Sequence, residues 1–94
     1  MRITTLIWKA RFVEKLRQKH KVSTVEAEQV FAGRPRIQFA QRGDVAGENL
    51  YRALGRTDAG RYLVIFFIYK GKGRALPISA RDMTAKERRS YGKK

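Results

Sequence analysis

Arginine is the residue type through which this chain is best equipped to do chemistry. Thirteen of its 22 basic residues are arginines, and with only eight Asp and Glu the formal net charge is +14. The planar guanidinium group donates paired hydrogen bonds that match the oxygens of a phosphate. A small domain with this charge attracts a polyanion or an acidic protein. We therefore expect a nucleic acid or an acidic protein as its partner.

RNA cleavage is the reaction that these residue types permit. The 2′-hydroxyl attacks the adjacent phosphorus, so the enzyme helps to remove one proton, donates another and stabilises charge on the phosphoryl oxygens. We expect Arg81 and Arg52 to hold the phosphate, with His20, Glu87 or Tyr91 assisting proton transfer. Further contacts to RNA are expected from Arg88, Lys70 and Arg74.

Each of these side chains also has a structural interpretation. His20 would be a cation at the end of a helix, favourable against the helix dipole. Glu87 stands three residues after Thr84, the spacing of a capping box, and it could also orient an arginine. Tyr91 could pack on the sheet instead of contacting RNA. Arg52 lies between Leu50 and Leu54 in an alternating pattern, so it faces either a groove or an edge.

Composition excludes several other function classes. The chain has no Cys and one His, which rules out a disulfide, a cysteine nucleophile and a Cys/His zinc site. The eight carboxylates are scattered, so we expect no hard-cation site and no cofactor. The longest apolar run, residues 62–69, is too short to span a bilayer, and residues 1–10 lack a signal-peptide pattern. These features favour one cytoplasmic domain over residues 1–94, with no membrane partner.

Periodicity predicts an α+β fold: a small antiparallel sheet with two N-terminal helices and a short C-terminal helix. Capping boxes at Ser23 and Thr84 mark two helix starts, and Gly33 with Pro35 marks a helix end. Pro77 predicts an edge or a bulge in the last strand. The expected strands are 3–8, 36–40, 48–57, 62–69 and 74–80, and the expected helices are 10–20, 23–32 and 84–91. We expect five aromatic residues in the core: Trp8, Phe12, Phe31, Phe66 and Phe67.

The order of several short motifs resembles that of BrnT-type toxins over nearly the whole chain. The N-terminal motifs are Trp8, Lys15-Leu16, Lys19-His20-Lys21-Val22-Ser23, Glu26-Ala27 and Val30-Phe31. The later ones are Gly55, the strand 63–69, Ile78-Ser79-Ala80-Arg81 and Glu87-Arg88 with Tyr91. Three positions depart from the family pattern. Lys9 and Lys21 stand where an acidic residue and a glycine are usual, and Pro77 interrupts a strand that is usually rich in Ile and Val.

This resemblance implies a RelE-like ribonuclease fold and a toxin that cleaves RNA and arrests translation. It also implies a cognate acidic antitoxin with a ribbon-helix-helix domain, through which the complex contacts DNA. Two other functions are compatible with the charge alone. One is a nucleic-acid-binding module without catalysis, which would show a steep salt dependence of binding. The other is a structural partner whose charge is neutralised by an acidic protein.

Overall fold

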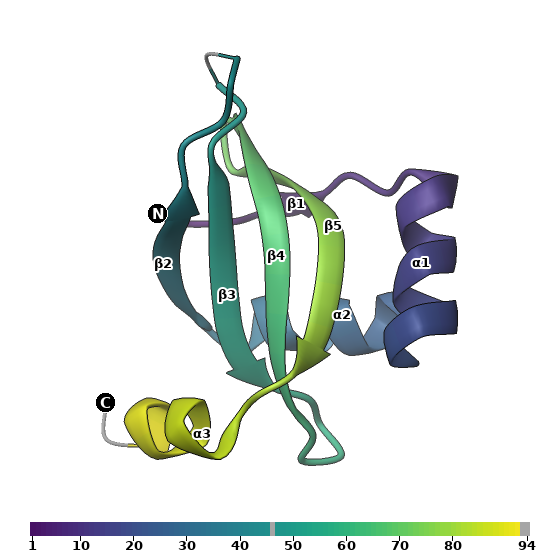
Figure 1. Ribbon diagram of the computed structural model, residues 1–94, viewed down its shortest axis with the longest axis vertical. Helices are drawn as coiled ribbons and strands as arrows, with labels where there is room; N and C mark the ends of the chain where they lie inside the picture. The colour runs from purple at the N-terminus through teal and green to yellow at the C-terminus, as the bar shows by residue number, and fades with distance from the viewer. Residues whose placement is uncertain (46, 93–94) are drawn as a thin grey trace.

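A five-stranded sheet forms the centre of the molecule, and three helices pack around it (Figure 1). The computed structural model describes residues 1–45 and 47–92. The strand order across the sheet is β1-β5-β4-β3-β2. The elements, in chain order, are β1 Thr5–Leu6, α1 Ala10–His20, α2 Thr24–Ala32, β2 Arg36–Gln41, β3 Leu50–Arg56, β4 Tyr62–Gly71, β5 Arg74–Asp82 and α3 Ala85–Gly92.

The sheet is mixed, so the prediction of an antiparallel sheet was wrong for its first strand. The strands β2 to β5 are joined by tight connections and pair antiparallel, as expected. Two helices separate β1 from β2, and these two strands form opposite edges of the sheet. At its edge, β1 runs parallel to β5. This strand is also shorter than the predicted 3–8. Alternation along a sequence reports which residues share a face, but it does not report strand direction.

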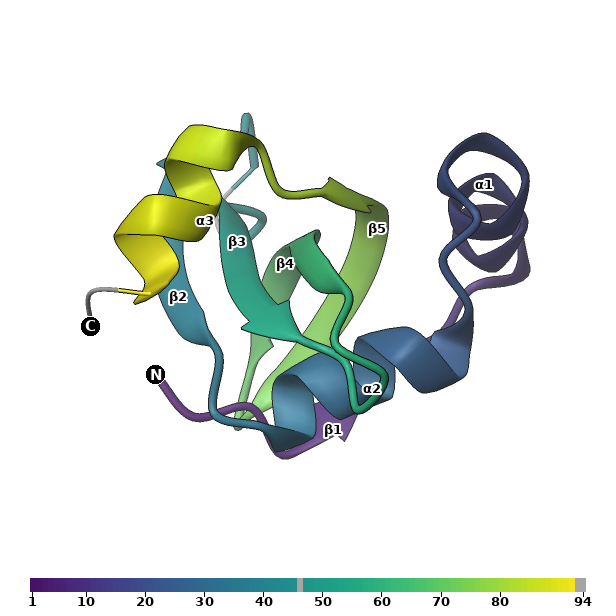
Figure 2. The ribbon, with the colours of Figure 1, turned by 90° about the horizontal axis from the view of Figure 1, so that it is seen from below.

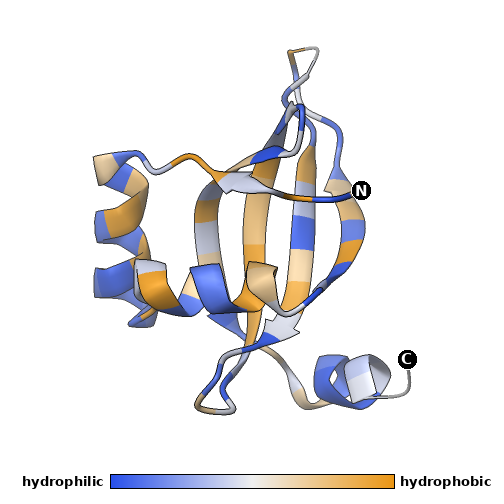
Figure 3. Cartoon of the chain, turned by 180° about the vertical axis from the view of Figure 1, so that it is seen from behind, coloured by the Kyte–Doolittle hydropathy of each residue, from blue (hydrophilic) through white to orange (hydrophobic). Residues whose placement is uncertain are grey.

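The two faces of the sheet carry different helices. Figure 2 shows α2 on one face, which we call the α2 face, and α3 on the other, the α3 face, while α1 lies beside β5. The main core fills the α2 face, where Leu63, Ile65 and Phe67 of β4 are fully buried with Leu16 of α1 and Val30 of α2. In Figure 3, β4 is hydrophobic along most of its length.

A smaller cluster lies on the α3 face. Leu54, Val64 and Met83 are buried there, with Tyr62, Phe66 and Tyr91 packed against them. This placement corrects one prediction, because Phe66 lies outside the main core and is only partly buried. Phe67, its neighbour in β4, is fully buried as predicted. Trp8 and Phe31 are partly buried and pack against the main core. The prediction for Phe12 was wrong, because this partly buried residue belongs to neither core cluster of the described residues and its ring lies under Arg11.

Local sequence signals place the helix ends and the bulge. Ser23 and Glu26 form the predicted capping box of α2. At its other end the left-handed conformation is taken by Arg34, with a φ of 58°, while Gly33 has a φ of −86°. Pro77 lies at an irregularity in the pairing of β4 and β5, as a residue without a backbone N–H favours.

Candidate functional site

The register of the sheet places Arg52 on the α3 face next to an aromatic ring. Arg52 of β3 stands opposite Gln38 of β2 on one side and opposite Phe66 of β4 on the other. Ser79 of β5 continues the same row. Side chains opposite one another in neighbouring strands are about 5 Å apart at Cβ. The predicted alternation of β3 is confirmed, and Arg52 faces the partly open side of the sheet.

Arg81 lies one row away on the same face, opposite Val64 of β4. Two strand spacings and two residue steps separate it from Arg52, which places the two Cα atoms about 12 Å apart. The guanidinium carbon of Arg81 lies 5.5 Å from the ring centre of Phe66. The two arginines that the sequence predicted to hold phosphate therefore flank one aromatic side chain.

Glu87 of α3 holds Arg81 through a two-pronged ion pair. Arg81 Nη1 donates to Glu87 Oε1 at 2.7 Å, and Nη2 donates to Oε2 at 3.0 Å. Glu87 also accepts from the backbone N–H of Thr84, and its own N–H donates to the Thr84 hydroxyl, which completes the predicted capping box. One carboxylate thus starts α3 and orients the arginine.

The ion pair determines the charge state of Glu87. The hydrogen bonds from Arg81 lower the pKa of the Glu87 carboxyl to about 2, against a smaller opposing effect of burial. The same contact raises the pKa of Arg81. A carboxylate with this pKa carries no proton to donate near neutral pH and is a weak general base. Glu87 is therefore better suited to positioning Arg81 than to transferring protons.

Both arginines are held by neighbours and still have donors to offer. Arg52 uses Nε to donate to Gln38 Oε1 at 2.9 Å, which leaves its two Nη groups without a partner among the described residues. Arg81 uses Nη1 twice, toward Glu87 and the Asp82 carbonyl, and Nη2 once. Since a guanidinium has five N–H donors, Arg81 retains its Nε–H and one Nη2–H. Those two point the same way, so they can bind a phosphate while Glu87 stays in place.

Tyr91 and Arg88 of α3 meet Tyr62 at the end of the sheet. The guanidinium carbon of Arg88 lies 4.2 Å from the centre of the Tyr62 ring. Tyr91 contacts the same ring edge to face, with 6.1 Å between the ring centres. These two predicted site residues therefore share the α3 face with Arg52 and Arg81.

His20 is not brought to this face. It ends α1, where its carbonyl accepts a hydrogen bond of 2.9 Å from Arg61 Nη2. Arg61 Nε also donates to Asp82, whose position in β5 alternates with that of Arg81 and so faces the other side of the sheet. The hydrogen bond from Arg61 lowers the pKa of Asp82, and the charge of His20 adds to the effect. The surroundings of His20 are a structural ion-pair network.

Lys70 and Arg74 lie at the opposite end of the sheet from α3 (Figure 1). They flank the turn between β4 and β5, and Arg74 donates to the carbonyls of Gly71 and Lys70. The structure separates them from the Arg52–Arg81 pair by most of the length of the strands.

The structural roles of three residues were missed in the sequence analysis. Phe66 lies in an apolar run without alternation, so the sequence did not show which face of the sheet its side chain occupies. The strand register shows it. Gln38 gave no signal, because its role depends on standing opposite Arg52. Arg61 ties the end of α1 to the start of α2 and to β5, through Lys21, Glu26 and Asp82.

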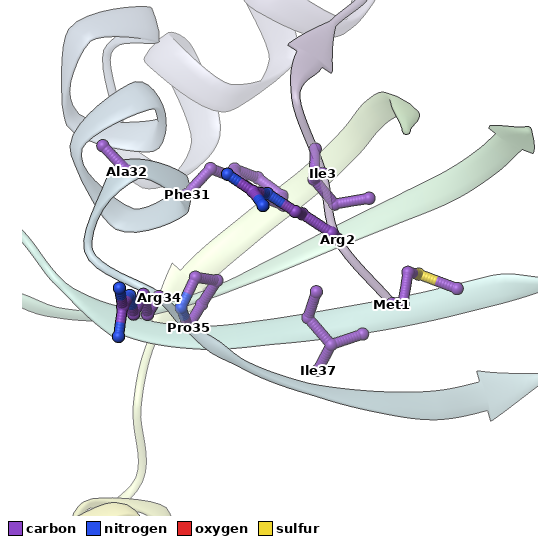
Figure 4. Close-up of a pocket in the computed structure, with 8 residues that line it drawn as sticks. All are labelled: Met1, Arg2, Ile3, Phe31, Ala32, Arg34, Pro35 and Ile37. Atoms are coloured by element: carbon purple, nitrogen blue, oxygen red, sulfur yellow. The ribbon is translucent and has the colours of Figure 1, made fainter. Parts of the chain in front are cut away.

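Another concavity lies on the α2 face, away from these arginines. This pocket has a volume of about 490 Å³. It is bounded by Met1 to Ile3, by the end of α2 and by the start of β2 (Figure 4). None of the predicted site residues lines it. In the described ranges no group of three His, Cys, Asp or Glu side chains could hold a metal ion. No helix among the described elements is long and apolar enough to cross a membrane.

The sequence was also compared with known proteins. No curated protein matches the chain. The family model described as the ribonuclease toxin BrnT of type II toxin–antitoxin systems matches residues 8–87, which include all of β2 to β5 and the start of α3. The chain therefore belongs to the BrnT family and is a ribonuclease toxin of a type II toxin–antitoxin system.

Proposed function

We propose that the α3 face of the sheet is where this toxin binds and cleaves RNA, with Arg52 and Arg81 as the phosphate-binding residues. One observation carries the proposal: both arginines project from this face, are held by Gln38 and Glu87, and keep unpartnered donors. Donors that are fixed before the substrate arrives stabilise developing charge without reorganisation. The sheet and its helices would be a RelE-like ribonuclease scaffold.

The proposed reaction is an intramolecular transfer at phosphorus. The 2′-oxygen loses its proton and forms a bond to phosphorus, while the bond from phosphorus to the 5′-oxygen breaks and that oxygen gains a proton. The products are a 2′,3′-cyclic phosphate and a free 5′-hydroxyl. Arg52 and Arg81 would neutralise the charge that builds on the non-bridging oxygens, using the Nη groups of Arg52 and the Nε–Nη2 edge of Arg81.

Tyr91 is the proton-transfer candidate that shares the α3 face with these arginines. Glu87 acts in this proposal as a positioning residue for Arg81, because its pKa of about 2 suits it poorly to proton transfer. We assign no step to His20, which lies with the Arg61 network on the other face. Lys70 and Arg74 would contact RNA outside the cleavage site.

The antitoxin partner that the family implies would neutralise the toxin by charge. The chain carries a net charge of +14, so an acidic antitoxin segment laid on the α3 face would exclude RNA from it. We propose that this antitoxin carries a ribbon-helix-helix domain, so that the complex meets DNA only through it. We also propose that cleavage takes place in the cytoplasm and arrests translation.

The test is controlled expression of the chain in bacteria, with growth followed and RNA 5′ ends mapped. Wild type should arrest growth and create recurring new 5′ ends. Arg81→Ala should abolish both while the purified protein keeps its circular dichroism spectrum. Arg17→Ala is the matched control, because it removes one arginine from the exposed surface of α1. Toxicity of Arg81→Ala equal to wild type at the same protein level would refute the proposed site.

A further inference from the structure

A second concavity on the α3 side lies at the end of the sheet, between the first residues of β4 and the C-terminal half of α3. Its volume is about 500 Å³, within the range of small-ligand sites. Among residues 1–45 and 47–92, no carboxylate lines it. Its walls are formed by Arg56, Tyr62, Arg88, Arg89, Tyr91 and Gly92.

In the part of the chain that the structure describes, the three arginines of this pocket have no acidic partner. Carboxylates pair with Arg17, Arg61 and Arg81 elsewhere in the molecule. Within residues 1–45 and 47–92, no such ion pair involves Arg56, Arg88 or Arg89. Like charges gathered in one concavity repel one another, so a bound anion relieves a cost that the free protein carries. The pocket is therefore an anion site by its charge.

The aromatic part of the pocket narrows the kind of anion. The guanidinium carbons of Arg88 and Arg56 lie 4.2 Å and 5.8 Å from the centre of the Tyr62 ring. Guanidinium planes and tyrosine rings are the surfaces on which unpaired nucleobases stack. A nucleotide offers both a base for such a surface and a phosphate for the arginines.

We propose that this pocket binds the unpaired nucleotide of single-stranded RNA next to the bond that is cleaved, with Tyr91 lining both the pocket and the cleavage site. Tyr62 and Phe66 share a face of β4 and are four residues apart, about 13 Å along the strand. Both belong to the cluster on which α3 packs, so an RNA strand on the Arg52–Arg81 pair can reach the pocket. A base held here must be unpaired, which makes single-stranded RNA the substrate. The identity of the polymer rests on the proposed function, whereas the binding site rests on the pocket itself.

The experiment measures binding without cleavage. The probe is a fluorescent RNA 12-mer with 2′-O-methyl groups, which lacks the attacking hydroxyl, and the measurement is fluorescence anisotropy at several salt concentrations. Arg56→Ala and Arg88→Ala should each weaken binding about five- to tenfold and lower the slope of log affinity against log salt by about 1. Arg17→Ala removes the same charge from α1 and should change the affinity less than about twofold.

An abasic scan tests the stacking part of the proposal. One position of the 12-mer at a time loses its base, and wild type should show one sensitive position that becomes insensitive in Arg88→Ala. Affinities of Arg56→Ala and Arg88→Ala equal to that of Arg17→Ala would overturn the site. A scan without a sensitive position would also overturn it, because it would reduce the pocket to a phosphate contact. Loss of antitoxin binding with unchanged RNA binding would assign the pocket to a protein and overturn the inference.

These outcomes are separate from those of the proposed function. A wild-type chain that binds the methylated RNA through this pocket but leaves cellular RNA intact would support the inference and refute the cleavage proposal. A chain that cleaves RNA, together with pocket variants that bind the methylated RNA as well as wild type does, would support the cleavage proposal and refute the inference about the pocket.

Discussion

Replacing Glu87 by Gln isolates the charge of the carboxylate that holds Arg81. Glutamine occupies the same volume and can still accept from the Thr84 N–H, so the capping box at the start of α3 is retained. What is lost is the charge of the contact with Arg81 and one of its two hydrogen bonds of 2.7 and 3.0 Å, because the amide NH2 group of glutamine cannot accept from a guanidinium. The variant therefore tests the ion pair without removing the helix cap.

The size of the effect follows from the pKa of the carboxyl. A fall from 4.5 to about 2 corresponds to about 3 kcal/mol, at 1.36 kcal/mol for each tenfold change. The side chain of Glu87 is 21% exposed and that of Arg81 is 36% exposed, so screening by solvent reduces the value. We expect Glu87→Gln to lower the free energy of unfolding by about 1–2 kcal/mol at pH 7.

The dependence on pH has a definite sign. The pKa of Glu87 is lower in the folded than in the unfolded chain, so its stabilisation is complete above pH 4.5 and is lost as the pH falls toward 2. Less than half of the difference between wild type and Glu87→Gln should remain at pH 3. Urea unfolding, followed by Trp8 fluorescence at pH 7, 5, 4 and 3, measures this. A difference that is the same at pH 7 and pH 3, or absent at pH 7, would refute the reasoning.

Three further variants test the structure and the assignment of the site. Arg61→Ala should lower the free energy of unfolding by about 2 kcal/mol in urea titrations, because one guanidinium holds the end of α1, the start of α2 and β5 together. Gly55→Ala should cost about 1–3 kcal/mol by the same measurement, since an added Cβ would come within 2.7 Å of Val30 Cγ1. Gly33→Ala, with no contact below 3.4 Å and a negative φ, should cost far less. His20→Ala should leave RNA cleavage within about twofold of wild type, and a larger loss in a folded variant would return His20 to the site.

Sequence reasoning predicted best where a residue's role depends on its near neighbours. The capping boxes at Ser23 and Thr84 each depend on a residue three positions away, and both form. The alternation in β3 placed Arg52 on the same face as Leu50 and Leu54, because side chains alternate along a strand whatever it pairs with. For Glu87 of α3, the sequence allowed several roles, one of which was to orient an arginine. The structure shows that it contacts Arg81 of β5 through two hydrogen bonds.

The features that sequence reasoning missed depend on register or on strand direction. The strand β1 pairs parallel with β5, from which it is separated by most of the chain, and its own sequence pattern does not show the direction of that pairing. Phe66 and Phe67 are adjacent and equally hydrophobic, yet one fills the core and the other lies between two arginines. Their faces became known only with the pairing of β4 to β3 and β5.

The two arginines of the α3 face make different electrostatic contributions. Arg81 is balanced by Glu87, so the pair brings geometry to the site and little net charge. Arg52 is held by the neutral amide of Gln38, so in the proposed site its full positive charge would be available to the phosphate. A site with both arginines unpaired would bind phosphate more strongly in the ground state as well as in the transition state, which adds nothing to the rate of the chemical step. If Arg81 binds the phosphate as proposed, its pairing with Glu87 would keep the donors fixed while limiting the attraction of RNA that is bound without being cleaved.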